Sequence, residues 1–289
     1  MAAIAIADAA GALEAYELHA FTYEVDADTG VAVATLSNPE KLNCISVNQH
    51  WEFFAVLEHA ARDEDARAVV WIGEGRAFNA GADLGGARTT HIPDHLCDAM
   101  RARGMAPGTD MVLKNLTLAF WDFPKPSVCA VNGLAVGGGA NIALANYHDL
   151  VVCSEEARFK YPFAKLGLTP ELGSSLVMPM IAGMARTKAM MYLGEWFSAA
   201  AAKEMGLANE VVPADRLRAR ALEIAGKLAE QSPDALRLSK RILNHHLRQR
   251  LPEVLDVENA TIFECVKAHM GGELPEGFGD GGPKKQSKL

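Results

Sequence analysis

The sequence predicts an α/β fold in which helices connect the strands of a buried sheet, with a purely helical segment after it. Short apolar runs typical of buried strands alternate with stretches whose apolar residues recur at helical spacing. Beyond Val212 and Pro213 the strand pattern stops and only helical spacing remains. A chain of 289 residues, 49% of them hydrophobic and 22% charged, is long enough for one large core with an appendage.

The predicted strands are four apolar runs, at residues 31–36, 68–72, 127–131 and 150–153. The first run closes in the turn Ser37-Asn-Pro39. A helix is expected from Ser46, which stands at an N-cap position, to Ala61, because apolar residues there have helical spacing. The polar segment at 87–107 shows neither pattern and is expected to be a mobile loop.

Two helices are expected in the C-terminal part, over residues 214–231 and 233–250, and the second of them is strongly basic. We therefore divide the chain into four parts. They are an N-terminal extension at 1–19, a core at 20–212, a helical segment at 213–270 and a flexible tail rich in Gly, Pro and Lys at 271–289.

Charge and cysteine usage argue against several classes of function. A net charge of -8 disfavours a nucleic-acid partner, because phosphate binding requires a basic face. The five cysteines are scattered without a CxxC pair, so neither a disulfide framework nor a metal site is indicated, and a reducing compartment is expected. No uncharged apolar run is long enough to span a bilayer, so no membrane partner is expected.

The two ends of the sequence bear on location. The first twenty residues contain no Lys or Arg and are interrupted by Asp8 and Glu14, unlike a secretory signal or a transit peptide. The last three, Ser287-Lys288-Leu289, form the tripeptide that the peroxisomal import receptor reads. We expect a peroxisomal location if the source is eukaryotic and a cytoplasmic one otherwise.

Two glycine-bearing loops, residues 76–84 and 132–142, follow the second and third predicted strands. Glycine lets the backbone approach a ligand closely, and Gly137-Gly138-Gly139 runs directly into an apolar helix whose first amides attract negative charge. Taken alone, a triple glycine would also suit a dinucleotide or phosphate loop. This one lacks both the GxGxxG spacing and the Lys-Ser/Thr that follow in such loops.

From Thr35 to Pro213 the sequence resembles the crotonase superfamily, also called the enoyl-CoA hydratase/isomerase family. The resemblance lies in the two loops, the turn Asn38-Pro-Glu-Lys-Leu-Asn43, Lys125-Pro126, and the stretches at 197–199 and 206–213. It implies a ClpP/crotonase-like spiral of ββα units. It also implies an acyl-CoA substrate, no separate cofactor since coenzyme A is part of that substrate, and a homotrimer or dimer of trimers formed through the C-terminal helical segment.

The resemblance also implies the residues of the site. The backbone amides of Ala82 and Gly138 would form an oxyanion hole for a thioester enolate. Lys41 would meet a CoA phosphate as a point charge. The full set of residues implied for CoA binding is Lys41, Leu42, Ala80, Ala82, Asp83 and Leu84.

The glutamates of this family distinguish its reactions. Hydratases use two, but here the corresponding positions hold Asn141 and Phe163, so we expect both to line the substrate pocket instead. Glu171, in Gly167-Leu-Thr-Pro-Glu-Leu-Gly-Ser-Ser175, stands where 3,2-enoyl-CoA isomerases of the peroxisomal type carry their single catalytic glutamate. The resemblance therefore implies an isomerase for β-oxidation of unsaturated fatty acids, in which one carboxyl group acts first as base and then as acid.

Other interpretations stay open at this point. Glu171 could activate water in an enoyl-CoA hydratase or acyl-CoA hydrolase, or could simply begin a helix after Pro170 in a non-catalytic acyl-CoA-binding homologue. Asn141 is either a plain helix residue or a substrate-contacting amide. Asp149 is expected to fix a loop, and His91 and His95 are expected to be exposed loop residues. A solvated face or a contact with CoA phosphates is expected for the basic helix residues Arg237, Lys240, Arg241, Arg248 and Arg250.

Overall fold

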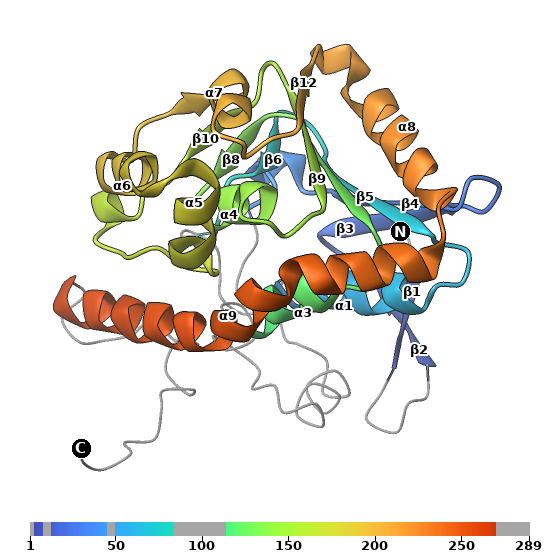
Figure 1. Ribbon diagram of the computed structural model, residues 1–289, viewed down its shortest axis with the longest axis horizontal. Helices are drawn as coiled ribbons and strands as arrows, with labels where there is room; N and C mark the ends of the chain where they lie inside the picture. The colour runs from blue at the N-terminus through green and yellow to red at the C-terminus, as the bar shows by residue number, and fades with distance from the viewer. Residues whose placement is uncertain (1–2, 8–12, 45–49, 84–113, 270–289) are drawn as a thin grey trace.

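A computed structural model describes residues 3–7, 13–44, 50–83 and 114–269 (Figure 1). Several of the predictions above concern residues outside these ranges: the N-cap Ser46, Leu84, His91, His95, the segment at 87–107 and the tail at 271–289.

Two sheets make up the core, and from β5 to β10 consecutive strands of the chain alternate between them. The larger has the order β12-β9-β7-β5-β4-β3 and is parallel except for the antiparallel β3–β4 pair. Its strands are β3 Phe21–Asp26, β4 Val31–Leu36, β5 Ala68–Gly73, β7 Ser127–Val131, β9 Leu150–Ser154 and β12 Glu210–Val212. The smaller sheet, β11-β10-β8-β6, consists of β6 Ala77–Asn79, β8 Leu134–Val136, β10 Arg158–Lys160 and β11 Phe197–Ser198.

Helices follow pairs of strands, so the chain repeats the predicted ββα unit. The helices are α1 His50–Arg62, α3 Leu116–Asp122, α4 Gly138–Leu144, α5 Ser174–Ala182, α6 Met184–Leu193, α7 Ala199–Glu204, α8 Leu217–Ala229 and α9 Pro233–His269. Single 3-10 turns are η1 Pro39–Lys41, η4 Ala164–Leu166 and η5 Ala214–Arg216. The four predicted strands and the helix predicted over 214–231 are thus confirmed, the last as η5 and α8.

Both faces of the larger sheet are covered, which explains why its strands read as continuous apolar runs. On one face, Val70 and Ile72 of β5 pack against α8, which presents Leu217, Ala221 and Ala225 (Figure 1). On the other face, Val69 and Trp71 belong to the main core with α1 and α3. Alternate residues of one strand therefore serve two separate apolar layers.

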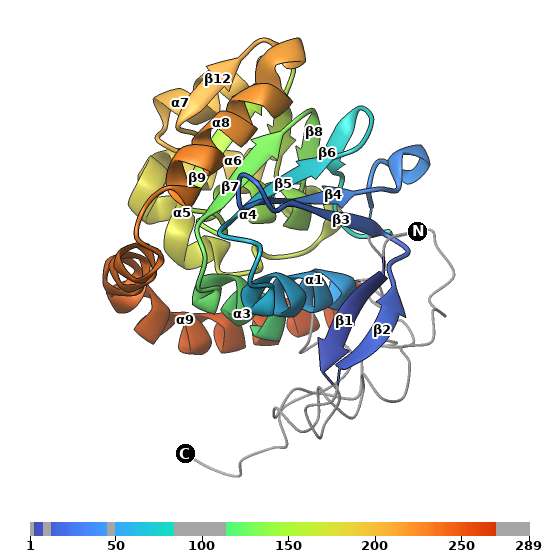
Figure 2. The ribbon, with the colours of Figure 1, turned by 90° about the vertical axis from the view of Figure 1, so that its right-hand side faces the viewer.

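The helix predicted to end at Arg250 is longer than expected, because α9 runs through Pro252 to His269. The prediction stopped at the proline, which removes a helical hydrogen bond and usually ends a helix. Here tertiary packing outweighs that loss: Leu251 and Leu255 are fully buried against Trp121 of α3 and residues of α5. Figure 2 shows α9 passing beneath the core, close to α3.

The N-terminal residues form a separate two-stranded sheet, β1 Ala3–Ala7 and β2 Leu13–Glu17, which packs on α1 (Figure 2). Glu52 of α1 is buried and holds the chain that leaves β2. Its carboxylate accepts hydrogen bonds from the backbone amides of His19, at 3.1 Å, and Ala20, at 2.7 Å. The Glu52 side chain thereby ties the two-stranded sheet to the core.

Candidate active site

The first glycine-bearing loop, residues 76–84, contains β6, and the part after β6 packs against the second loop. Gly81 has φ +86°, a left-handed conformation that favours glycine. A Cβ at Gly81 would lie 2.8 Å from the carbonyl oxygen of Val136 and 4.0 Å from the amide nitrogen of Gly138. The side-chain oxygen of Asn79 accepts a hydrogen bond from the Gly81 amide at 2.8 Å. The backbone leading into Ala82 therefore lies beside the start of α4, as a shared oxyanion hole requires.

The second loop leads into α4 through glycines that other residues could not replace without backbone strain or a clash. Gly137 has φ +56°, and a Cβ at Gly139 would lie only 2.1 Å from the carbonyl oxygen of Asn79. Gly138 is the first residue of α4, and the amides of a first helical turn have no partner within the helix. The close approach of the two loops thus depends on glycine at two positions and leaves the Gly138 amide free of the helix's own bonding pattern.

Glu171 lies between η4 and α5, and its carboxylate faces Gly138. A Cβ at Gly138 would lie 3.1 Å from Oε1 of Glu171. The main-chain carbonyl of Glu171 accepts hydrogen bonds from the side chains of Asn141, at 3.0 Å, and Ser174, at 2.7 Å. Leu172, the next residue, has φ +58°, which is uncommon for a residue with a side chain. The fold therefore brings the predicted base and the predicted second oxyanion donor together.

Burial raises the pKa of Glu171 to about 7, and the negative charge of Glu258 on α9 adds to the rise. Both protonation states of this carboxyl group are then populated near neutral pH. Glu171 is nevertheless only half-buried as a residue, so part of its surface stays open to a ligand. A group with these properties can accept a proton and return it to the same substrate.

Asn141 and Phe163, the two residues at the hydratase glutamate positions, lie next to Glu171 and the second glycine loop. Asn141 is fully buried in α4; its side-chain nitrogen bonds the Glu171 carbonyl, while its side-chain oxygen has no hydrogen-bond partner among the described residues. Phe163 is buried next to the second loop, where a Cβ at Gly137 would lie 3.9 Å from its ring. Neither an amide nor a phenyl side chain can act as a general acid or base near neutral pH.

The residues implied for CoA binding gather where the turn after β4 meets the first loop. The exposed Lys41 forms an ion pair with Asp83 at 3.2 Å, and the carbonyl of Leu42 accepts a hydrogen bond from the Ala80 amide at 3.1 Å. Ala82 is exposed. These five residues form one continuous edge, and Leu84 lies outside the described ranges.

Asn43 holds this edge together and was not singled out by the sequence analysis. It is buried, with its amide nitrogen donating to the carbonyls of Glu74, at 3.0 Å, and Ala77, at 2.8 Å. Its side-chain oxygen accepts a bond from the Asn38 amide at 2.8 Å. An asparagine directly after a turn is the local signal that could have indicated this role, since asparagine tolerates a positive φ, here +54°.

The expectation that Asp149 fixes a loop is confirmed. Its carboxylate accepts a hydrogen bond from the Ser127 amide at 2.8 Å and pairs with Lys240 of α9 at 2.9 Å. Arg248 of the same helix pairs with Asp122 at 2.8 Å. Part of the basic face of α9 therefore attaches the helix to the core.

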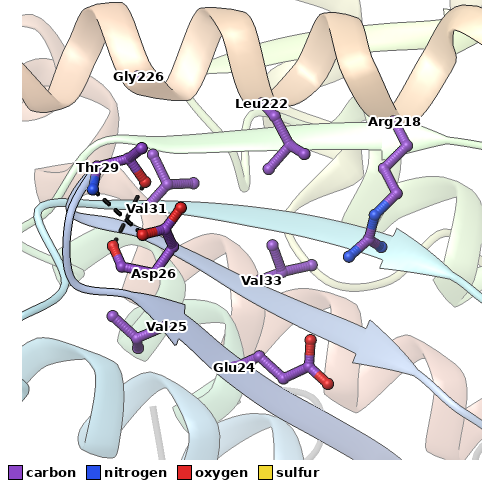
Figure 3. Close-up of a pocket in the computed structure, with 9 residues that line it drawn as sticks. All are labelled: Glu24, Val25, Asp26, Thr29, Val31, Val33, Arg218, Leu222 and Gly226. Atoms are coloured by element: carbon purple, nitrogen blue, oxygen red, sulfur yellow. Dashed lines mark hydrogen bonds between the residues drawn. The ribbon is translucent and has the colours of Figure 1, made fainter.

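A surface pocket of about 380 Å³ lies apart from this site, between β3, β4 and α8 (Figure 3). Val33 and Leu222 provide apolar wall, and Glu24 and Arg218 provide charge. None of its lining residues belongs to either glycine loop or to the Glu171 loop. In the described ranges, no three His, Cys, Asp or Glu side chains gather to hold a metal ion, and no helix is apolar over enough length to cross a bilayer.

Comparison with known proteins agrees with this geometry. The sequence matches the enoyl-CoA hydratase/isomerase family over residues 26–273. It is 34% identical over 235 residues to the 1,2-epoxyphenylacetyl-CoA isomerase of Escherichia coli (strain K12), covering 80% of this chain and 85% of that protein. It is 30% identical over 240 residues to the peroxisomal enoyl-CoA delta isomerase 3 of Mus musculus, covering 83% and 72%.

The fold matches as well. The crystal structure of an enoyl-CoA hydratase/isomerase from Pseudoalteromonas atlantica T6c has a TM-score of 0.73 at 27% identity, covering 86% of this chain and 92% of that one. The predicted crotonase fold is thereby confirmed. A sequence match across most of the chain, on the same fold, shows that this protein belongs to the enoyl-CoA hydratase/isomerase family of the crotonase superfamily.

Proposed function

We propose that the protein is a 3,2-enoyl-CoA isomerase that uses Glu171 as its only acid–base group. The supporting observation is the position of the Glu171 carboxylate, which faces Gly138 and has a pKa near neutrality. The similarity to an enoyl-CoA delta isomerase supports the same reaction. Asn141 and Phe163, at the two hydratase glutamate positions, supply no second carboxylate to activate a water molecule.

In the proposed reaction the Glu171 carboxylate takes a proton from C2 of a 3-enoyl-CoA. The electron pair of the broken C–H bond delocalises onto the thioester oxygen, where the amides of Ala82 and Gly138 stabilise the charge. The protonated Glu171 then returns the proton at C4, and the double bond lies between C2 and C3. The reaction requires no separate cofactor, because coenzyme A is part of the substrate.

Isomerisation of 3-hexenoyl-CoA tests the proposal, with conjugated 2-hexenoyl-CoA followed by absorbance. Glu171→Gln should lower kcat by about 10²–10⁴-fold, the usual contribution of an acid–base group. The exposed Glu230, changed to Gln, is the matched control and should keep full activity. Full activity in Glu171→Gln, or no turnover by the unchanged protein, refutes the isomerase.

A second candidate is hydration or thioester hydrolysis with Glu171 activating water, favoured by the structural similarity to enoyl-CoA hydratases. Crotonyl-CoA hydration and release of free CoA are measured in the same preparation. Hydration that depends on Glu171, without isomerisation, supports the hydratase. Tight CoA binding without turnover of any of these substrates supports a non-catalytic acyl-CoA-binding protein.

We also propose that the protein is a homotrimer or a dimer of trimers. Large apolar side chains from η4, α5, α6 and the following connection are each at least 50% exposed: Leu166, Met180, Met184, Tyr192, Leu193 and Trp196. These elements pack against one another, and an exposed apolar area of this kind marks a protein interface. Sedimentation equilibrium tests the proposal: a trimer or hexamer that dissociates on Tyr192→Glu supports it, and a monomer contradicts it.

A further inference from the structure

The loop that carries Glu171 is held from outside by a second buried carboxylate. Glu258 of α9 is 4% exposed, and its two oxygens accept hydrogen bonds from the backbone amides of Gly173, at 2.7 Å, and Ser175, at 2.9 Å. Gly173 is the N-cap of α5 and has no side chain to bond the free amides of the first turn. Glu258, which lies on a helix distant in sequence, therefore caps the start of α5, a role that a side chain at the N-cap usually fills.

Glu171, Leu172 and Gly173 each have a backbone group that is held by a side chain from another part of the chain. The carbonyl of Glu171 is bonded by Asn141, and the carbonyl of Leu172 accepts a hydrogen bond from the Tyr147 hydroxyl at 3.0 Å. Glu258 then holds the amide of Gly173, where φ is +74°. The two consecutive left-handed residues, Leu172 and Gly173, thus lie between anchors from α4 and α9, which keeps the strained turn in one conformation.

We propose that Glu258 is a positioning residue of the reaction: by holding the Gly173 and Ser175 amides it sets the turn that directs the Glu171 carboxylate toward Gly138. This role rests on the isomerase proposal above. The charge of Glu258 has a second effect, because two carboxylates near each other resist joint ionisation. The titratable groups that face Glu171 are Glu258 from α9 and Tyr147 from the connection after α4.

A purely structural cap and a positioning residue differ in what Glu258→Gln changes. The amide keeps the shape of the side chain but loses its charge, and its NH2 group faces one of the two backbone amides. A displacement of about 1 Å at a reacting group can cost about 10²-fold in rate, so we expect kcat to fall by about that factor while KM changes little. The acid limb of the pH profile should also move to lower pH, since the pKa of Glu171 no longer carries the contribution of a negative neighbour.

Glu253→Gln, an exposed glutamate of the same helix, is the matched control and should change neither kcat nor the pH profile. Glu258→Asp keeps the charge with a shorter reach, so it should lower kcat and leave the acid limb in place. If Glu258→Gln does not fold, the kcat of Glu258→Asp still tests the positioning role. An unchanged kcat and acid limb in a folded Glu258→Gln protein, whatever its Tm, overturns the proposal.

Infrared difference spectroscopy separates this proposal from the identity of the reaction. The carbonyl stretch of protonated Glu171, identified by its absence in Glu171→Gln, is titrated in the unchanged protein and in Glu258→Gln. A midpoint that moves to lower pH supports the link even if 3-hexenoyl-CoA is not turned over, in which case only the isomerase fails. A midpoint that stays in place refutes the electrostatic link between the two carboxylates.

Discussion

His148 makes the stability of this protein sensitive to acid. It lies in the connection after α4 and is 3% exposed, with its ring 5.5 Å from that of Phe120 and 5.8 Å from that of Trp71. Neither ring nitrogen has a hydrogen-bond partner in the part of the chain that the structure describes. Burial, together with a smaller effect of the positive charge of Lys240, lowers the pKa of His148 to about 3. The folded protein therefore keeps this imidazole neutral.

The magnitude follows from the linkage between protonation and folding. In the unfolded chain a histidine has a pKa of about 6.5, so as the pH falls below that value the unfolded state gains a proton that the folded state cannot bind. Stability attributable to His148 is therefore complete above about pH 6.5 and is lost progressively down to about pH 3. Between pH 7 and pH 5 the loss amounts to about 2 kcal/mol.

His148→Leu removes this term, and the comparison must be between proteins rather than within one. Burial raises the pKa values of Glu171 and Glu258, and a raised carboxyl pKa adds stability as the pH falls, which opposes the histidine in the unchanged protein. The unchanged protein and His148→Leu share those carboxyl groups, so their effect cancels in the comparison. The stability difference between His148→Leu and the unchanged protein should hence favour the variant by about 2 kcal/mol more at pH 5 than at pH 7.

Urea unfolding followed by tryptophan fluorescence at pH 5, 6, 7 and 8, at one protein concentration, measures this difference. His246→Leu, an exposed histidine on α9, controls for the loss of a histidine as such. If the difference between His148→Leu and the unchanged protein is the same at every pH, the imidazole is not held neutral and the reasoning fails.

Three further results are expected. Gly139→Ala should abolish turnover and lower Tm, because its Cβ would lie 2.1 Å from the carbonyl oxygen of Asn79, whereas Gly226→Ala, with nothing within 4 Å, should do neither; a fully active Gly139→Ala refutes the steric argument. Asn43→Ala removes a side chain that makes three hydrogen bonds to the backbone and should cost about 2–3 kcal/mol in urea unfolding; a cost below about 0.5 kcal/mol contradicts this. The kcat/KM should fall about tenfold per pH unit below about pH 7, because Glu171 must be ionised to act as base, and a flat profile from pH 5 to 8 excludes Glu171 as the base.

The parts of this structure that local sequence patterns encode were predictable. Strands β5 and β7 are buried on both faces and so leave continuous apolar runs. The glycines at 137 and 139 are required by a positive φ and by a close backbone contact, so the second loop was visible in the sequence.

What could not be predicted depends on contacts between distant segments. Glu258 lies in a helix where nothing nearby in sequence distinguishes it from the exposed Glu253, and only the packing of α9 brings it to the Glu171 loop. The continuation of α9 past Pro252 has the same origin, since local propensity favours an end there and the burial of Leu251 and Leu255 opposes it. The single residue Asn43 likewise reveals its function only through the three backbone groups it bonds.

The two loops that meet at Gly81 and Gly138 also bear on how such a protein changes over evolutionary time. If peptide groups hold the developing charge, a point mutation cannot delete the charge-stabilising group, because every residue except proline brings its own N–H. Selection then acts on this half of the site only through the shape of the backbone. The opposite half depends on the side chain of Glu171, which a single codon change can replace. A scaffold divided in this way can keep one reactive intermediate and still acquire different products.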